Sequence, residues 1–239
     1  KIREVLDSDN YPESNLAIII GDTTGSMGRV PRIIMDNLPK LRGALINKGY
    51  LPQAQLMVGA VNDAVWSQFP IQISQAENGN EIDEHISNIF IEGGGGSDYH
   101  ESYDLMFYYL NKYVKMDCFE KRGKKGYLFV MADEKVRESI NPSHVNTFIG
   151  DKIDEEISTL KVIEELKSKF EVYWLFPNGS SYFGERGREL GIHDQLLSIF
   201  GQNLIFVDDP ETICETIVSI IGANEGFDIN QITKDLSDL

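Results

Sequence analysis

The chain has 239 residues, of which 41% are hydrophobic and 25% charged, a profile typical of a globular protein with enough apolar material for one large core. Its 38 acidic and 22 basic residues give a formal charge of -16, which would repel a phosphate backbone and argues against nucleic acid as a general partner. No apolar run approaches the length that spans a membrane, so we expect a cytoplasmic protein without a membrane partner.

Short apolar runs rich in β-branched residues alternate with segments of helical period. This alternation predicts a Rossmann-like, doubly wound α/β fold: a mostly parallel six-stranded sheet with helices on both faces. Only residues 62–65 separate the second strand from the third, which is too short for a parallel crossover, so these two should form an antiparallel hairpin at a sheet edge. We expect the strands at 16–21, 55–61, 66–73, 127–132, 171–176 and 203–207.

A single domain should cover residues 1–239, with its core at about 16–221 and an acidic tail at 225–239 that forms either a last helix or a frayed end. The two cysteines, Cys118 and Cys214, lack the spacing of a zinc site or a disulfide framework, so we expect buried, reduced thiols. Helices are expected at 30–48, 82–90, 100–114, 157–169, 188–200 and 210–221.

Two connections are longer than a compact domain needs, at 134–156 and 177–187. Both follow the carboxyl ends of predicted strands, where α/β proteins usually place functional residues. The alternative is that each loop is a solvated insertion without a role.

The first strand runs directly into Asp22-Thr23-Thr24-Gly25-Ser26, where oxygen-bearing side chains recur at alternate positions. Asp22, Thr24 and Ser26 can therefore converge beyond the end of the strand. They offer only oxygen atoms, which are the ligands of hard cations such as Mg²⁺, whereas zinc would call for His or Cys. The alternative is a tight turn followed by a cap for the helix that starts near Arg29.

Two further segments favour a metal site. The strand at 127–132 is followed by Asp133, which lies at the same sheet edge as Asp22 if both strands are parallel. Two carboxylates at one edge repel each other unless a cation lies between them. The glycine run 93–96 leads to Ser97 and Asp98, and such runs are typical of backbone that passes close to another group. It would bring Ser97 or Asp98 to the metal.

In this order, the three segments resemble the metal-ion-dependent adhesion site of von Willebrand factor A domains. The signature of that family is Asp-x-Ser/Thr-x-Ser, then a Thr or Asp in a Gly-rich loop, then an Asp after a strand. The resemblance covers about 16–221, including the edge hairpin. It implies one bound Mg²⁺, with Mn²⁺ or Ca²⁺ as alternatives, and the ligands Asp22, Thr24, Ser26, Asp98 and Asp133.

The run Gly-Gly-Ser-Asp-x-x-Glu is more similar to bacterial and phage members, because many adhesive members have Thr in this loop. If Asp98 is a direct ligand, three carboxylates neutralise a dication and weaken its attraction for an acidic partner, whereas Ser97 would restore that attraction. The resemblance implies a module that binds a carboxylate of a partner protein, with an ATPase of the AAA+ class as a candidate partner. The sequence does not fix the oligomeric state.

Other residues carry weaker signals. Asp63 lies in an Asn-Asp turn and is interpreted as turn chemistry, while Glu101 is expected either to support the metal ligands or to cap a helix. The four histidines form no recognisable catalytic pattern, so we do not expect an enzyme. The alternatives are an Mg²⁺-dependent phosphohydrolase that uses Asp22, although such enzymes usually carry a second Asp where this chain has Thr24, and a metal-free scaffold.

Overall fold

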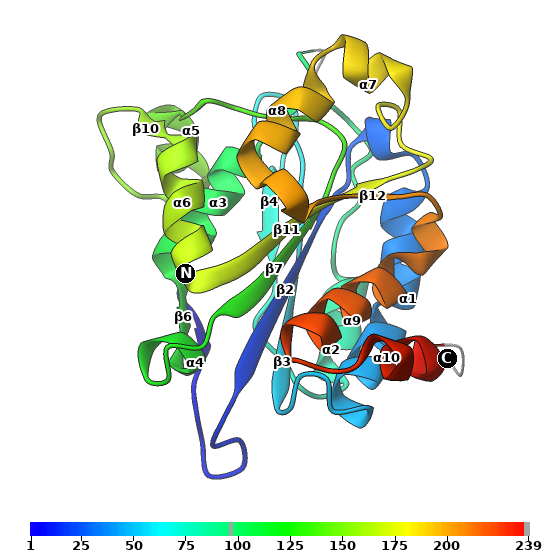
Figure 1. Cartoon of the computed structure of the whole chain (residues 1–239). Coiled ribbons are helices and arrows are strands. Elements are labelled where there is room, and N and C mark those ends of the chain that lie inside the picture. Colours follow the sequence, from blue (N-terminus) through cyan, green and yellow to red (C-terminus); the bar gives the residue numbers. More distant parts are fainter. Residues whose placement is uncertain (96–97, 237–239) are drawn as a thin grey trace.

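The computed structural model describes residues 1–95 and 98–236. A six-stranded sheet with the order β12-β11-β7-β2-β3-β4 runs through the molecule (Figure 1). Its strands are parallel except for β4, which pairs antiparallel with β3 at the edge. The predicted fold class and edge hairpin are therefore confirmed. The strands are β2 (Asn15–Asp22), β3 (Ala54–Val61), β4 (Ile71–Ile73), β7 (Gly126–Met131), β11 (Phe170–Pro177) and β12 (Leu204–Val207).

Helices cover both faces of this sheet, so the central strand β2 is buried along its whole length. Ile18 and Ile20 belong to one hydrophobic cluster and Ala17 and Ile19 to the other, because successive side chains of a strand point to opposite faces. On the first face lie α3 (Tyr103–Tyr113), α6 (Thr159–Lys169) and α8 (Ile192–Phe200). On the second lie α1 (Val30–Asn47), α2 (Glu81–Ser87), α9 (Ile213–Asn224) and α10 (Ile229–Leu236).

The third strand is much shorter than predicted. Strand β4 begins only at Ile71, and the preceding residues form a loop. The side chain of Asn62 donates to the Phe69 carbonyl at 3.3 Å, and the Asp63 carbonyl accepts from the Ser67 amide at 2.8 Å. These hydrogen bonds take up backbone groups that a longer strand would need.

Two predicted helices also differ. Residues His100–Glu101 form a short strand, β5, which pairs with β8 (Lys135–Val136), so α3 begins only at Tyr103. The helix predicted at 188–200 is divided into α7 (Glu185–Glu189) and α8 by Gly191, whose φ of 70° is left-handed. The tail contains α10, whose Ile232 is buried in the core, and residues 237–239 lie outside the described part.

Residues outside 16–221 also pack on the core. Val5 is buried in β1 (Arg3–Val5), which pairs in parallel with β6 (Val114–Met116). Both cysteines are free and buried, as predicted. The remaining elements are β9 (Ser139–Ile140), β10 (Ile157–Ser158), α4 (Asp117–Glu120), α5 (Pro142–His144), a π-helix η2 (Val145–Ile149) and the 3₁₀ turns η1 (Gly25–Met27), η3 (Gly201–Asn203) and η4 (Pro210–Thr212).

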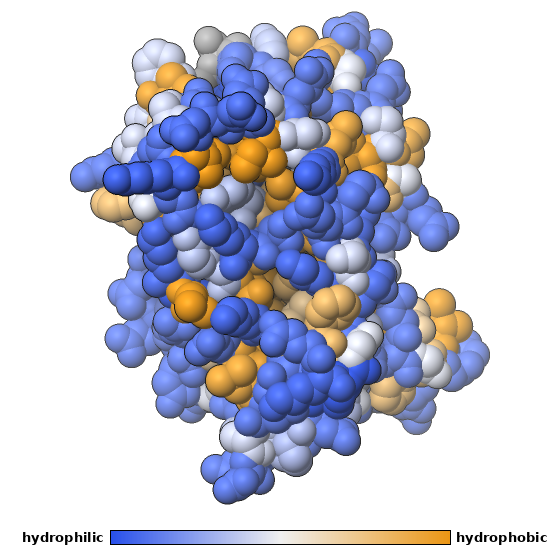
Figure 2. All heavy atoms as spheres, turned by 90° about the vertical axis from the view of Figure 1, so that its left-hand side faces the viewer, coloured by the Kyte–Doolittle hydropathy of each residue, from blue (hydrophilic) through white to orange (hydrophobic). Residues whose placement is uncertain are grey.

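Hydrophilic residues cover most of one face of the molecule (Figure 2). Figure 2 shows the face at the left of Figure 1 as largely hydrophilic, with small, separate hydrophobic areas. None of the described helices is long and apolar enough to cross a membrane.

Gly59 in β3 tests the packing of the edge hairpin. A Cβ at this position would lie 2.6 Å from the Gln72 carbonyl oxygen of β4 and 2.8 Å from the Ile20 side chain. We therefore expect Gly59→Ala to lower the free energy of unfolding by about 1–3 kcal/mol, because backbone must move to admit the methyl group. Urea denaturation measures this change. Gly184→Ala is the control, since its Cβ meets nothing within 4 Å, and equal stability of the two variants would contradict the packing shown here.

Candidate metal centre

The pairing of β2 with β7 brings two carboxylates to one edge of the sheet. These strands are parallel neighbours, so their carboxyl ends meet there. Asp22 is the last residue of β2, and Asp133 follows the end of β7. Both side chains are completely buried.

Two hydroxyl groups link these carboxylates. The Thr24 hydroxyl donates to Asp22 Oδ1 at 2.6 Å, and the Ser26 hydroxyl donates to Asp133 Oδ1 at 2.7 Å. The two hydroxyl oxygens are 3.1 Å apart. The fold thus gathers four of the five predicted ligand residues. Of the alternative, the tight turn is present, because the Thr24 amide donates to Asp22 Oδ1 at 2.8 Å and the 3₁₀ turn η1 follows, whereas α1 has no side-chain cap hydrogen bond.

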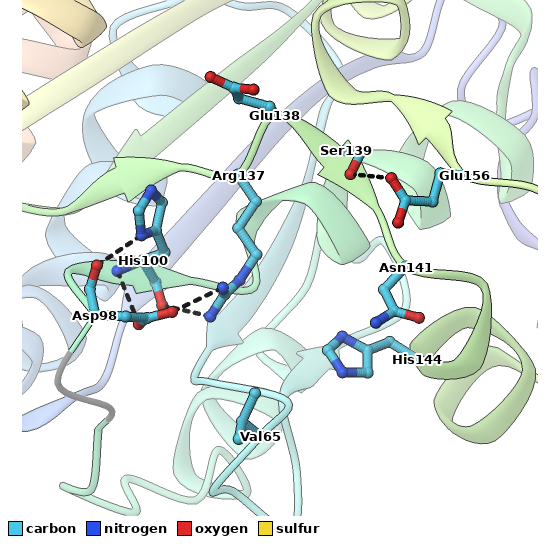
Figure 3. Close-up of a pocket in the computed structure, with 9 residues that line it drawn as sticks. All are labelled: Val65, Asp98, His100, Arg137, Glu138, Ser139, Asn141, His144 and Glu156. Atoms are coloured by element: carbon cyan, nitrogen blue, oxygen red, sulfur yellow. Dashed lines mark hydrogen bonds and ion pairs between the residues drawn. The ribbon is translucent and has the colours of Figure 1, made fainter.

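The fifth predicted residue, Asp98, lies elsewhere. Its carboxylate accepts a hydrogen bond from Arg137 at 2.9 Å, and its side chain is 53% exposed (Figure 3). Arg137 also donates to Asp63 at 3.3 Å and to the His100 carbonyl at 2.9 Å. In this arrangement Asp98 contributes no oxygen atom to the cluster around Asp22. Ser97, the alternative ligand, lies outside the described residues.

Two glutamates line the cavity of the site: Glu134, which sequence reasoning did not consider, and Glu101, which was expected either to support the metal ligands or to cap a helix. Glu101 and Glu134 are 1% and 4% exposed, and both face a cavity of about 460 Å³ together with Thr24 and Ser26. Glu101 lies in β5, and the cap position of α3 is the next residue, Ser102. The signal available for Glu134 was its position directly after Asp133.

Backbone from two loops encloses the cavity. The Gly25 amide donates to the Gly94 carbonyl at 2.7 Å and the Gly93 amide to the Thr23 carbonyl at 3.3 Å, so the glycine run does pass close to the motif. A Cβ on Gly25 would lie 3.2 Å from the Gly93 carbonyl oxygen, which explains the need for glycine here. From the loop after β11, the Ser181 amide donates to the Ser26 carbonyl at 2.8 Å.

The carboxylates of this cavity oppose one another electrostatically. Burial, and after it the charge of Asp22, raises the pKa of Asp133 to about 7, of Glu134 to about 8 and of Glu101 to about 10. Burial also raises the pKa of Asp22 itself, against hydrogen bonds from Thr24 and Tyr103 that lower it. A bound cation would relieve this mutual repulsion.

The donor set fits a hard cation. Asp133 Oδ2 and Glu101 Oε2 are buried and have no hydrogen-bond partner among the described residues, so each has a free lone pair in the cavity region. Within the described ranges, no three His, Cys, Asp or Glu side chains are grouped so as to hold a metal by themselves. A cation here would therefore also need the hydroxyl oxygens of Thr24 and Ser26. Oxygen donors of this kind match Mg²⁺, Mn²⁺ or Ca²⁺.

No family model and no curated protein matches the sequence. Solved structures do match the fold. The pilus adhesin SpaC from Lactobacillus rhamnosus GG, in its open conformation, is 12% identical with a TM-score of 0.59, over 93% of this chain and 31% of the adhesin. A von Willebrand factor type A structure from Catenulispora acidiphila is 13% identical with a TM-score of 0.51, over 90% of this chain and 43% of that one.

A third match is proximal thread matrix protein 1 from the mussel byssus, solved with a zinc-occupied MIDAS motif. It is 11% identical with a TM-score of 0.55, over 92% of this chain and 49% of the mussel protein. These matches show that the chain has a von Willebrand factor A-type fold. The chain spans about a third to a half of the length of these proteins.

Asp104, in the first turn of α3, gives a test of burial near this site. It is 1% exposed, neither carboxylate oxygen has a hydrogen-bond partner among the described residues, and burial raises its pKa to about 7 from 3.8. Because the pKa of the folded state is the higher one, the carboxyl group contributes its full stability below pH 3.8 and loses it as the pH rises through 7.

We therefore expect Asp104→Asn to raise the free energy of unfolding at pH 8 by a few kcal/mol and to change it little at pH 4. Urea denaturation at both pH values measures the difference, with the exposed Asp9→Asn as control. An equal effect of Asp104→Asn at pH 4 and pH 8 would show that the carboxyl group is not desolvated.

Proposed function

We propose that this chain is a metal-dependent protein-interaction module in which Asp22, Thr24, Ser26 and Asp133 hold one Mg²⁺ ion. The observation that carries the proposal is the buried group of oxygen donors in which two hydroxyls join two carboxylates. Unpaired carboxylate oxygens remain beside it. Mn²⁺ and Ca²⁺ share the ligand preference and are the alternatives.

The partner is proposed to be a protein that presents an Asp or Glu side chain. When bound, a divalent cation supplies an electrophilic position that can accept a carboxylate oxygen. The chain's own residues orient that position: Thr24 and Ser26 fix the two carboxylates, and Tyr103 donates to Asp22 Oδ2. The similarity to an adhesin and to a matrix protein with an occupied MIDAS motif supports a protein partner. The resemblance of the Gly-Gly-Ser-Asp run to bacterial and phage proteins supports an AAA+ ATPase as one candidate.

The enzyme alternative is less well supported. Asp22 would have to act as a nucleophile, but such phosphohydrolases usually carry a second Asp two residues later, and this chain has Thr24 there. Hydrolysis of p-nitrophenyl phosphate that is lost in Asp22→Asn would establish the enzyme instead.

Calorimetric titration of the chelator-treated protein with Mg²⁺ tests the metal centre. We expect one saturable site, and a loss of affinity of about tenfold or more in Asp22→Asn and in Asp133→Asn, because each removes a charge and an oriented ligand. Asp98→Asn should change the affinity much less, since that carboxylate is bonded to Arg137.

The exposed Asp9→Asn is the control for a general change in charge. Absence of Mg²⁺, Mn²⁺ and Ca²⁺ binding in the intact protein would contradict the proposal and favour the metal-free scaffold. A loss in Asp98→Asn as large as that in Asp22→Asn would show that Asp98 moves from Arg137 to the metal.

A further inference from the structure

Four large apolar side chains are exposed on two adjoining segments near the metal centre. Val65, Trp66 and Phe69 lie in the loop between β3 and β4, and Phe90 follows α2; they are 57%, 69%, 46% and 53% exposed. The rings of Phe69 and Phe90 meet edge to face with centroids 6.2 Å apart. We call the three aromatic residues, together with Val65 beside them in the chain, the aromatic rim. Single exposed apolar residues are ordinary, but a group of them usually marks an interaction surface.

The loop that carries the rim is held in place at its backbone. Asp63 anchors it: its carbonyl accepts from the Trp66 and Ser67 amides at 3.2 and 2.8 Å, and its Oδ1 accepts from the Val65 amide at 2.9 Å. The Ala64 amide donates to the Ser102 hydroxyl at 2.8 Å. The loop therefore presents its apolar side chains on a fixed backbone, which lowers the entropy that binding would cost.

The rim is continuous with the metal centre. The Gln72 side chain binds both the amide and the carbonyl of Phe90, at 2.9 and 2.8 Å. Three residues later, the Gly93 amide donates to the carbonyl of Thr23, inside the metal-binding motif.

On the other side, the hydroxyl of Thr23 donates to the Asn62 side chain at 2.9 Å, at the base of the rim loop. Val65 also lines a cavity of about 460 Å³ with Asp98 and Arg137 (Figure 3). Hydrogen bonds at Gly93 and Asn62 thus hold the segments that carry the rim beside the metal-binding motif, and we refer to this region as one face of the molecule.

We propose that the aromatic rim is a second contact on this face, which receives apolar side chains of the same protein partner that presents its Asp or Glu to the metal. This inference rests on the proposed function. A protein surface is favoured over an anionic lipid surface because the chain carries a formal charge of -16. Tryptophan is also one of the side chains that most often contribute a large part of the binding energy of protein interfaces.

A phage-displayed library of random dodecapeptides, selected on the Mg²⁺-loaded protein, tests the inference. We expect the selected peptides to combine an Asp or Glu with a large apolar residue at a fixed spacing. Trp66→Ser with Phe69→Ser should weaken their binding by about tenfold or more, because it removes the apolar contact. The same double variant should bind Mg²⁺ like the parent protein. Leu160→Ser on α6, which removes a side chain that is 52% exposed elsewhere, is the matched control.

The chain's own tryptophans provide a direct readout. Trp66 is exposed, whereas Trp174 is fully buried and donates to the Ala132 carbonyl at 3.0 Å. Quenching of fluorescence by acrylamide therefore reports mainly Trp66. A selected peptide should protect this fluorescence from quenching, and the same peptide with its acid changed to the amide should not.

The outcomes separate the two proposals. Peptides that need Mg²⁺ and their acidic residue, but bind equally well without the rim, would overturn the second contact and leave the metal-dependent function standing. Peptides that need Trp66 but neither Mg²⁺ nor an acidic residue would overturn carboxylate binding and the shared face together. A selection without such peptides, or binding of phosphatidylcholine vesicles that is lost in Trp66→Ser, would overturn a protein as the occupant.

Discussion

The parallel pairing of β2 with β7 is the constraint on which the site depends. It places Asp22 and Asp133 at adjacent strand ends, where both side chains are completely buried. Buried carboxylates in contact with few positive groups are unfavourable as anions, so each must bind a proton, accept hydrogen bonds or neutralise a cation. Thr24 and Tyr103 each donate to one oxygen of Asp22, whereas Asp133 accepts from Ser26 at Oδ1 and its Oδ2 has no partner among the described residues. The fold therefore leaves buried carboxylates at this edge that a bound cation would stabilise.

The sequence predicted those parts of the structure that local patterns determine. Strands β2, β3 and β7 are continuous apolar runs because both of their faces are covered, and the motif at the end of β2 needs only short-range geometry to bring Thr24 and Ser26 to Asp22. The ion pair between Asp98 and Arg137 could not be predicted in this way, because it joins two loops that are 39 residues apart. The choice between the two roles expected for Glu101 could not be made in this way either, since β5 exists only by pairing with β8.

The segment from Trp66 to Ile73 shows that one stretch of apolar sequence can adopt two structures, a loop and a strand. The apolar residues between Trp66 and Ile73 led to the prediction of a strand over this whole range, and only the last part of it forms β4. In the first part the apolar residues face solvent, because Asn62 and Asp63 bind the loop backbone and divert it from the sheet. The same residues that were interpreted as simple turn chemistry thus decide which apolar side chains remain available to a partner.

The distribution of basic residues indicates why the carboxylates of the metal centre would need a bound cation as their positive partner. Arg137 neutralises Asp63 and Asp98 on one side of the site. Within the described part of the chain, no basic side chain forms an ion pair of this kind with Asp22, Asp133 or the two glutamates of the cavity. On a protein with a formal charge of -16, an acidic group of a partner would otherwise be repelled. A divalent cation at this edge would offset the charges of Asp22 and Asp133, and its open coordination position could then accept a carboxylate on an otherwise acidic surface.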